Sequence, residues 1–197
     1  DTFGPTVRQV DFADYKANRE STPEDIVQSL PYIRAIIEAF QIPILELMGY
    51  EADDIIGTLA HCYSLLDCMV IIASDDKDML QLINENVIIS HSKKGTIDRL
   101  KFEETFGFEP VLFVDYLAIL GDEIDNVPGI KGIGKVGAQE LVQKIGTVET
   151  IYGNIAAVPS KYIEKLKNAQ ADAILSKKLI QLKTINIPKH KLVEPCA

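Results

Sequence analysis

Alternating strands and helices are predicted for the first part of the chain by its pattern of hydrophobic positions. Short apolar runs at residues 42–47, 69–74 and 87–90 are typical of buried strands, and apolar residues at helical spacing occupy 26–40 and 52–65. This alternation favours a mainly parallel sheet with helices on its faces. We therefore predict an α/β fold.

Local signals add detail near the start of the chain. Residues 1–21 are predicted to form a loop, and Thr22 and Pro23 are the residue types preferred at an N-cap and at the first helical position. Pro31 lies inside the helix that follows, so we expect it to kink or split that helix.

The rest of the chain is predicted to be mostly helical. A hairpin turn at 93–96 leads to a short strand near Ile97. The boundary near 107–110 divides the chain into an α/β core, 1–108, and a helical region, 109–197. Helices are expected at about 102–106, 110–120, 135–145, 147–154, 159–168 and 170–182.

Charge is distributed unevenly along the chain. The net charge of −9 argues against a nucleic-acid partner. However, residues 1–125 carry a net −15, whereas residues 126–197 carry +6. An acidic body joined to a basic tail is expected if metal ions neutralise the first part and phosphates meet the second.

Membrane and disulfide-rich classes are disfavoured by composition. No apolar run approaches the roughly 20 residues that cross a bilayer. Cys62, Cys68 and Cys196 lack C-x-x-C spacing and are typical of reduced thiols in a cytosolic protein. We expect a cytoplasmic protein.

Three groups of acidic residues follow predicted strands or open predicted helices. A helix dipole alone would favour one acid at a helix start, but not three. Parallel strands present their carboxyl ends at one edge of a sheet, so we expect the acids to converge there. All-oxygen ligation selects Mg²⁺ or Mn²⁺, and two such ions about 4 Å apart are the usual device for phosphodiester cleavage. The acids are Glu51, Asp53 and Asp54; Asp76 and Asp78; and Asp122 and Asp125.

The third acidic group is fused to a glycine-rich turn. On a helical turn, Asp122 and Asp125 would share one face. The turn that follows, 129–134, lets the backbone approach a ligand and offers N–H groups at a helix start, which suits a phosphate. Taken alone, the two acids would be explained by an acidic surface turn, and the glycines by an ordinary helix start. Their fusion favours a metal site tied to a nucleic-acid site.

An aromatic residue and two cations lie together at residues 15–19. Tyr15 could stack on a base, and Lys16 and Arg19 could hold phosphates. A solvated loop explains this cluster equally well.

In five motifs, the chain resembles the 5′-nuclease (5′→3′ exonuclease) domain of bacterial DNA polymerase I, a member of the flap-endonuclease family. The resemblance covers most of residues 1–145. It implies a PIN-like α/β/α core, a helical arch and a helix-hairpin-helix region. It also implies two-metal hydrolysis of DNA at 5′ flaps, nicks and primer ends, in primer removal and repair. The motifs are DYKANR, TPEDI, GYEADDIIGTLA, DKDMLQL and GDEIDNVPGIKGIGKVGA.

The resemblance also implies roles for single residues. The three acidic groups would hold the metals, with Asp1 at the place of another metal-site acid. Lys16, Arg19, Asp76 and Asp122 would form the catalytic set. Backbone carbonyls of the turn would hold a K⁺ ion beside the DNA. The DNA contacts would be Arg8, Tyr15, Lys16 and Arg19, together with Gly129, Lys131, Gly132, Gly134 and Lys135. A polymerase module in the same parent chain and a place at the bacterial nucleoid are also implied.

Three departures from the family pattern leave alternatives open. The family's first strand, with an Asp-Gly and another metal-site Asp, is absent. Asp75 stands where the family often has Gly or Ala, and Gly137 replaces a small β-branched residue. A truncated, catalytically incomplete DNA-junction binding module of the same fold is therefore the alternative to an active nuclease. A metal-dependent ribonuclease is a third hypothesis, but the glycine turn argues against it.

Overall fold

The computed structural model describes residues 4–188, and its first element is a short helix. Helix α1 (Val7–Asp11) begins after Thr6, whose hydroxyl accepts a hydrogen bond from the Gln9 backbone N–H. The Gln9 side chain accepts the Thr6 backbone N–H in return, at 2.9 Å. This capping box nucleates a helix where the apolar pattern predicts a loop, so the prediction for this segment is wrong.

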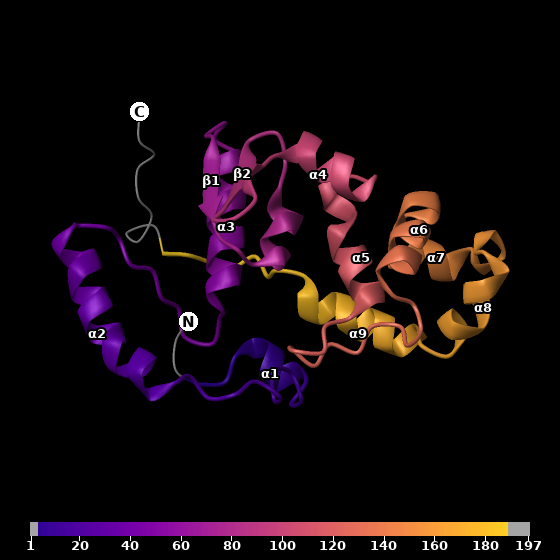
Figure 1. Cartoon of the computed structure of the whole chain (residues 1–197), viewed down its shortest axis with the longest axis horizontal. Coiled ribbons are helices and arrows are strands. Elements are labelled where there is room, and N and C mark those ends of the chain that lie inside the picture. The colour runs from indigo at the N-terminus through magenta and orange to yellow at the C-terminus, as the bar shows by residue number, and fades with distance from the viewer. Residues whose placement is uncertain (1–3, 189–197) are drawn as a thin grey trace.

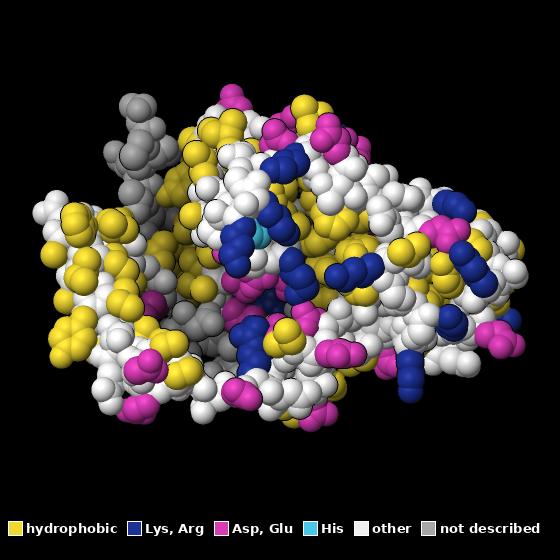
Figure 2. All heavy atoms as spheres, in the orientation of Figure 1, with side chains coloured by type: hydrophobic (Ala, Val, Ile, Leu, Met, Phe, Trp, Pro, Cys, Tyr) yellow, Lys and Arg dark blue, Asp and Glu magenta, His cyan; other side chains and the backbone are white. Residues whose placement is uncertain are grey.

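Helix α2 (Glu24–Ala39) stands apart from the body of the molecule (Figure 1). It begins after Pro23 and not after Thr22, and it runs unbroken through Pro31. The expected split is absent because a proline removes only one intrahelical donor, and helical turns on both sides maintain the rest. None of its residues is buried, and apolar side chains cover its visible face (Figure 2).

The segment after α2 is not the buried strand that its apolar run predicts. Ile42 is 56% exposed, and residues 42–46 are irregular. No strand within residues 4–188 pairs with them, so their backbone forms no strand-to-strand hydrogen bonds. Leu45 and Leu47 instead pack against a small cluster of Ile55, Ile185 and Ile187.

The sheet has three strands in the order β1-β2-β3. Strand β1 (Val70–Ala73) pairs in parallel with β2 (Val87–His91), which pairs antiparallel with β3 (Gly95–Ile97). Helix α3 (Ala52–Ser64) contacts β1. The predicted α/β class is confirmed, but the sheet is small and mixed, and of β1 only Ile72 is buried.

The remaining elements are helical and close to their predicted positions. The short 3₁₀ helix η1 (Lys77–Leu82) follows β1. Within residues 4–188, no helix has both the length and the apolar character needed to cross a bilayer. The others are α4 (Arg99–Phe106), η2 (Pro110–Leu112), α5 (Phe113–Leu120), α6 (Lys135–Ile145), α7 (Val148–Gly153), η3 (Ile155–Ala157), α8 (Ser160–Lys167) and α9 (Gln170–Ile180).

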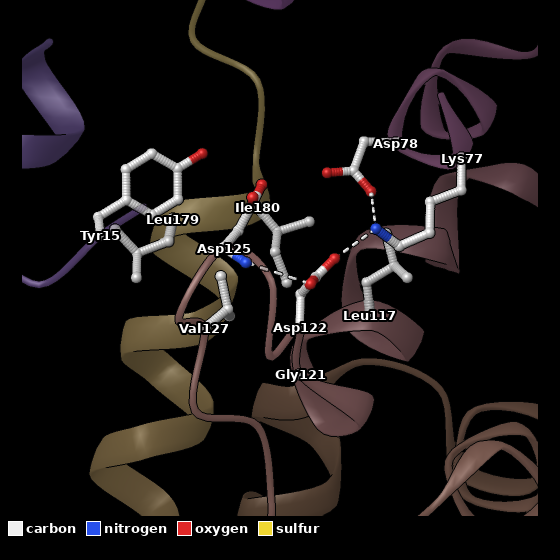
Figure 3. A pocket seen from close by; sticks show the side chains of 10 residues that line it. All are labelled: Tyr15, Lys77, Asp78, Leu117, Gly121, Asp122, Asp125, Val127, Leu179 and Ile180. Carbon is white, nitrogen blue, oxygen red and sulfur yellow. Dashed lines mark hydrogen bonds and ion pairs between the residues drawn. The ribbon is translucent and has the colours of Figure 1, made fainter. Parts of the chain in front are cut away.

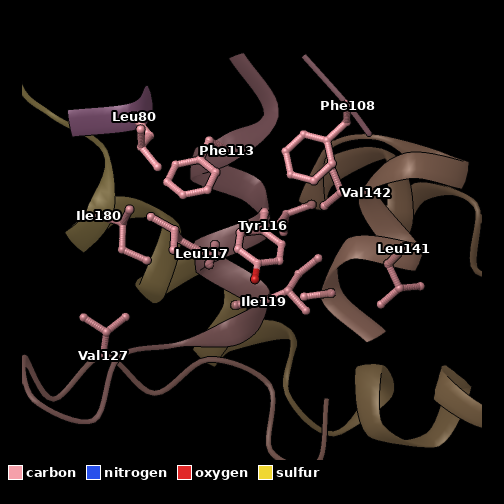
Figure 4. Packing of buried hydrophobic residues seen from close by; sticks show 14 of the residues in the cluster. Leu80, Phe108, Phe113, Tyr116, Leu117, Ile119, Val127, Leu141, Val142 and Ile180 are labelled. Atoms are coloured by element: carbon pink, nitrogen blue, oxygen red, sulfur yellow. The ribbon is translucent and has the colours of Figure 1, made fainter. Parts of the chain in front are cut away.

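Helix α5 lies at the centre of the main hydrophobic cluster (Figure 4). Phe113, Leu117 and Ile119 are nearly or completely buried and face α6, α9 and η1. The Phe113 ring packs edge-to-face on Phe102 of α4, with centroids 5.3 Å apart. The cluster therefore joins residues from both sides of position 108, and α5 carries the site loop that follows it on a rigid base.

A buried charge ties three helices together. The Asp115 carboxylate of α5 accepts the Val148 backbone N–H of α7 at 2.8 Å and the Lys177 ammonium of α9 at 2.6 Å. Asp115 is 3% exposed. A buried carboxylate of this kind is stable only while its donors remain, and those donors depend equally on it.

We expect Asp115→Ala to lower the free energy of unfolding by about 3 kcal/mol, because it leaves the buried Val148 N–H without its acceptor and the largely buried Lys177 ammonium with only the exposed Glu149. Urea unfolding followed by circular dichroism measures the effect. Glu149→Ala is the matched control, since Glu149 contacts the same ammonium but its side chain is 68% exposed; we expect a loss below about 1 kcal/mol. Equal losses in the two variants would contradict this account.

Candidate metal and nucleic-acid site

The predicted acidic groups occupy three neighbouring segments. Glu51, Asp53 and Asp54 open α3, and Asp76 and Asp78 lie at the junction of β1 and η1. Asp122 and Asp125 follow α5 and line a pocket together with Asp78 (Figure 3). In the space-filling view, acidic and basic side chains meet in a recess of the visible face (Figure 2).

Two of the acids have raised pKa values. Burial raises the pKa of Asp53, and the charge of Asp76 raises it further. Burial also raises the pKa of Asp78, where the charges of Asp76 and Asp122 act in the same direction against Lys77. The three acidic groups therefore lie within electrostatic reach of one another, and each opposes the ionisation of its neighbours.

Lys77 bridges two of the three segments. Its ammonium lies 2.5 Å from Asp122 Oδ2 and 3.3 Å from Asp78 Oδ1. Burial acts to lower the pKa of Lys77, but the hydrogen bond to Asp122 and the two acidic charges raise it overall. Burial acts to raise the pKa of Asp122, but the bond from Lys77, the Lys77 charge and the N–H groups of Asp125 and Ile124 together lower it. Lys77 thus holds together acids that would otherwise repel.

The Asp122 segment is a closed turn and not the helical turn that its spacing suggests. Asp122 Oδ1 accepts the Ile124 N–H at 2.9 Å and the Asp125 N–H at 3.3 Å. The backbones of Asp122 and Val127 exchange hydrogen bonds of 2.9 and 2.7 Å. The side chain satisfies its own loop, a common use of aspartate in turns.

Arg8 is buried beneath the site and is not at the surface, where a DNA contact would need it. It is 2% exposed and forms two bonds of 2.7 Å to Asp54, which is 1% exposed. Asp54 also accepts the Lys183 backbone N–H at 2.8 Å. Because Arg8 is buried and bonded to Asp54, the expectation that Arg8 contacts DNA is wrong. Asp54 supports the site from beneath through the same bonds.

The cluster at residues 15–19 folds against the acids. Tyr15 is 5% exposed, so its ring is not available for base stacking as predicted, and its hydroxyl lies 3.3 Å from Glu51 Oε2. Lys16 donates to Glu51 Oε1 at 2.8 Å. Arg19 donates to Asp125 Oδ1 at 2.8 Å. The sequence prediction places these residues and the acids in one site, and the structure brings them together.

Whether the acidic residues suit a metal ion depends on which of their oxygens are available to bind one. Within residues 4–188, no group of three or more His, Cys, Asp or Glu side chains is already arranged to hold a metal ion. Asp78 Oδ1 is buried and lacks a hydrogen bond in the described chain, and its 3.3 Å contact with Lys77 is an ion pair only. An orphaned carboxylate oxygen among mutually repelling acids fits a hard divalent cation. Asp1 lies outside the described residues.

The glycine turn divides into a structural part and an exposed part. The Gly129 N–H donates to Ser176 Oγ at 2.9 Å, so it is not available to a phosphate as predicted. The exposed part lines a surface groove and comprises Lys131, Gly132, Gly134 and Lys135. Gly134 has an extended backbone, and no described atom lies within 4 Å of the place a Cβ would take. The fold itself therefore does not require glycine at 134.

Sequence patterns did not identify Ser176 as a site residue. It is completely buried on α9, in a segment whose neighbours are apolar or basic. A small polar residue at a core position of a predicted helix is the only signal that the sequence carries.

Family models match the two parts of the chain in turn. The N-terminal resolvase-like domain of the 5′-3′ exonucleases matches residues 1–107, and their C-terminal SAM fold matches residues 108–193. The 5′-3′ exonuclease of Buchnera aphidicola subsp. Acyrthosiphon pisum is 37% identical over 95% of this chain and 68% of that protein. DNA polymerase I of Caldicellulosiruptor bescii is 38% identical over 91% of this chain, which spans only 22% of that protein.

Solved structures agree on the fold. The T5 5′-exonuclease with bound zinc superposes with a TM-score of 0.75 at 23% identity, over 91% of this chain and 71% of that one. The T5 flap endonuclease with DNA and metal ions gives the same TM-score, identity and coverage. A resolvase-like α/β unit followed by a helical unit is the class that this fold defines. The chain belongs to the 5′-3′ exonuclease family.

Removing one charge from the acid cluster tests its electrostatics. The Asp78 pKa in the folded chain lies above the ordinary 3.8, so ionised Asp78 costs stability at neutral pH, and this cost disappears below pH 3.8. We expect Asp78→Asn to raise Tm in EDTA at pH 7 by about 2–4 °C, and not at pH 3.5.

Asp75→Asn is the matched control, because hydrogen bonds from Ser92 lower the pKa of Asp75. That variant should have a lower Tm at pH 7. Differential scanning calorimetry measures both. A destabilised Asp78→Asn chain at pH 7 in EDTA would show that attraction to Lys77 outweighs repulsion at this position.

Proposed function

We propose that this chain is the nuclease part of a structure-specific 5′ nuclease, which hydrolyses DNA phosphodiesters at 5′ flaps, nicks and primer ends. The observation that carries the proposal is the meeting of Lys16 and Arg19 with Glu51 and Asp125, which brings cations and acids from distant segments to one place. Phosphodiester cleavage needs both: carboxylates for divalent metals, and cations for the phosphate. The family match and the DNA complex of the T5 flap endonuclease support the substrate.

The residues of the chain divide the chemistry between them. Glu51, Asp53, Asp76, Asp78, Asp122 and Asp125 would hold two Mg²⁺ or Mn²⁺ ions, which supply an activated water and stabilise the leaving oxygen. Lys16 and Arg19 already lie against Glu51 and Asp125. With those carboxylates holding metal ions, Lys16 and Arg19 would be free to hold the scissile phosphate, and their cationic charges would then be paired with the phosphate.

The exposed part of the glycine turn would bind the DNA backbone. Gly134 opens α6 without a side-chain cap and lines the same groove as Lys131 and Lys135, so the first N–H groups of the helix would be available to a phosphate there. The Gly132 carbonyl accepts the Lys165 ammonium at 2.7 Å. If backbone carbonyls of this turn held a K⁺ ion, the ion would compete with the Lys165 ammonium for that carbonyl, because two adjacent cations repel. We take 1–108 as the nuclease core and 109–197 as the DNA-binding region.

The chain spans only part of the length of the relatives it matches. The chain spans about a fifth of its DNA polymerase I relatives, 22% and 21% of two of them. A polymerase module in the same parent chain and a role in primer removal and repair therefore belong to the proposal. An incomplete DNA-junction binding module of the same fold is the alternative, and Mg²⁺-dependent turnover separates the two.

Asp122→Ala and Asp76→Ala should each reduce cleavage of a flap substrate by at least about 10³-fold, because a metal position loses its ligand. DNA affinity measured in Ca²⁺ by fluorescence anisotropy should change by less than about 10-fold, within about 1.4 kcal/mol. Glu123→Ala, in the same loop, is the control and should cleave normally. Equal losses of binding and cleavage would count against the metal assignment.

Lys131→Ala combined with Lys135→Ala should weaken DNA binding and reduce the slope of log K against log[salt] by about 2, because two phosphate contacts are lost. Titrations at several salt concentrations give the slope. Lys144→Ala with Lys161→Ala is the control, because both lysines are paired with Glu140. An unchanged slope in the Lys131 and Lys135 variant would remove the turn from the DNA interface.

A further inference from the structure

Residues 121–130 connect the acids Asp122 and Asp125 to the glycine turn, and the backbone closes this connection at both ends. The Asp122–Val127 pair exchanges two backbone hydrogen bonds, and the Ile130 N–H donates to the Ile119 carbonyl of α5 at 2.8 Å. The loop is therefore fastened to α5 at the point where the exposed turn begins.

The two ends of the loop are in direct backbone contact. Gly121 and Gly129 have φ values of +75° and +61°, which favour glycine. A Cβ on Gly129 would lie 2.6 Å from Gly121 N, and a Cβ on Gly121 would lie 2.9 Å from Gly129 N. Side chains on either residue would push the ends apart, so the contact exists only because both are glycine.

Ser176 secures this contact from the side of α9. Its hydroxyl is completely buried and accepts the Gly129 N–H at 2.9 Å. The next residue, Lys177, binds Asp115 of α5 and thereby fixes α9 against the helix that carries the loop. A buried hydroxyl without a partner costs stability, as does a buried N–H, so each holds the other in place.

We propose that Ser176 is a positioning residue that keeps the acids Asp122 and Asp125 at one fixed separation from the DNA-binding turn at residues 131–135. This inference rests on the proposed function. Two parts of one substrate would contact the two ends of the loop: the scissile phosphate at the acids, and the duplex backbone at the turn. A rigid connection then determines which phosphodiester is cut, because displacement of about 1 Å from the reactive geometry can cost about 10²-fold in rate.

The first test is hydrogen exchange of the Gly129 amide, followed by NMR in this chain. Ser176→Ala removes its acceptor, and we expect exchange of this amide to accelerate by about 10-fold or more. The Gly146 amide, bonded to the Val142 carbonyl at 2.9 Å, is the internal control and should not change. Ser176→Thr keeps the hydroxyl and should keep the Gly129 amide protected. An unchanged exchange rate of the Gly129 amide in Ser176→Ala would overturn the proposal that Ser176 fixes Gly129 in place.

The second test maps the cut position on a 5′-labelled flap at single-nucleotide resolution. Ser176→Ala should spread cleavage over neighbouring phosphodiesters and lower kcat by about 10-fold or more, with a smaller change in KM. Ala173→Gly weakens the same helix at a completely buried position without touching the bond, so it should keep a single cut position. Ser176→Thr should also keep it.

The outcomes of this test are distinct. Cleavage by Ser176→Ala at the wild-type position with kcat within about twofold would overturn the positioning role, as would equal spreading in Ala173→Gly. Absence of cleavage by the unsubstituted chain would instead count against the proposed function, and the exchange measurement would still show whether Ser176 holds Gly129.

Discussion

The buried ion pair between Arg8 and Asp54 is the constraint on which the site depends. Arg8 also donates to the Leu179 carbonyl at 2.7 Å and to the Gln181 carbonyl at 3.1 Å, where α9 ends. One guanidinium thus joins α1, the start of α3 and the end of α9. Because breaking a buried pair leaves an uncompensated charge, the three segments are held together by a cost of several kcal/mol for separating them. Glu51 and the cations that contact it are positioned by this junction.

The acidic site above that junction lowers the stability of the fold. Burial raises the pKa values of Asp53 and Asp78, and the charge of Asp76 raises both further, so burial and repulsion together oppose the ionisation of these two acids. Lys16, Arg19 and Lys77 offset part of the repulsion, but Asp78 Oδ1 remains without a hydrogen bond in the described chain. Clusters of partly buried, mutually repelling carboxylates are expected at sites that bind cations. They are unusual where acidic residues are simply exposed to solvent.

Much of the fold could be predicted because its signals are local. Helices α6 to α9 lie within two residues of their predicted bounds, since periodicity and breakers define them. Segment 42–47 could not be predicted, because an apolar run becomes a strand only beside a partner strand. The convergence of acids with Lys16 and Arg19 was accessible from spacing and the family resemblance. The burial of Arg8 and Tyr15 and the bond of Ser176 were not, because each depends on partners far away in the sequence.

The central claim is that these acids and cations form a metal-dependent nuclease site. Cleavage of a 5′-labelled flap substrate in Mg²⁺ and in EDTA, with binding measured in Ca²⁺, tests it most directly. The account predicts release of the flap in Mg²⁺ only, with binding retained in Ca²⁺. Tight binding without cleavage in Mg²⁺ would contradict it and would identify a DNA-junction binding module with an incomplete site.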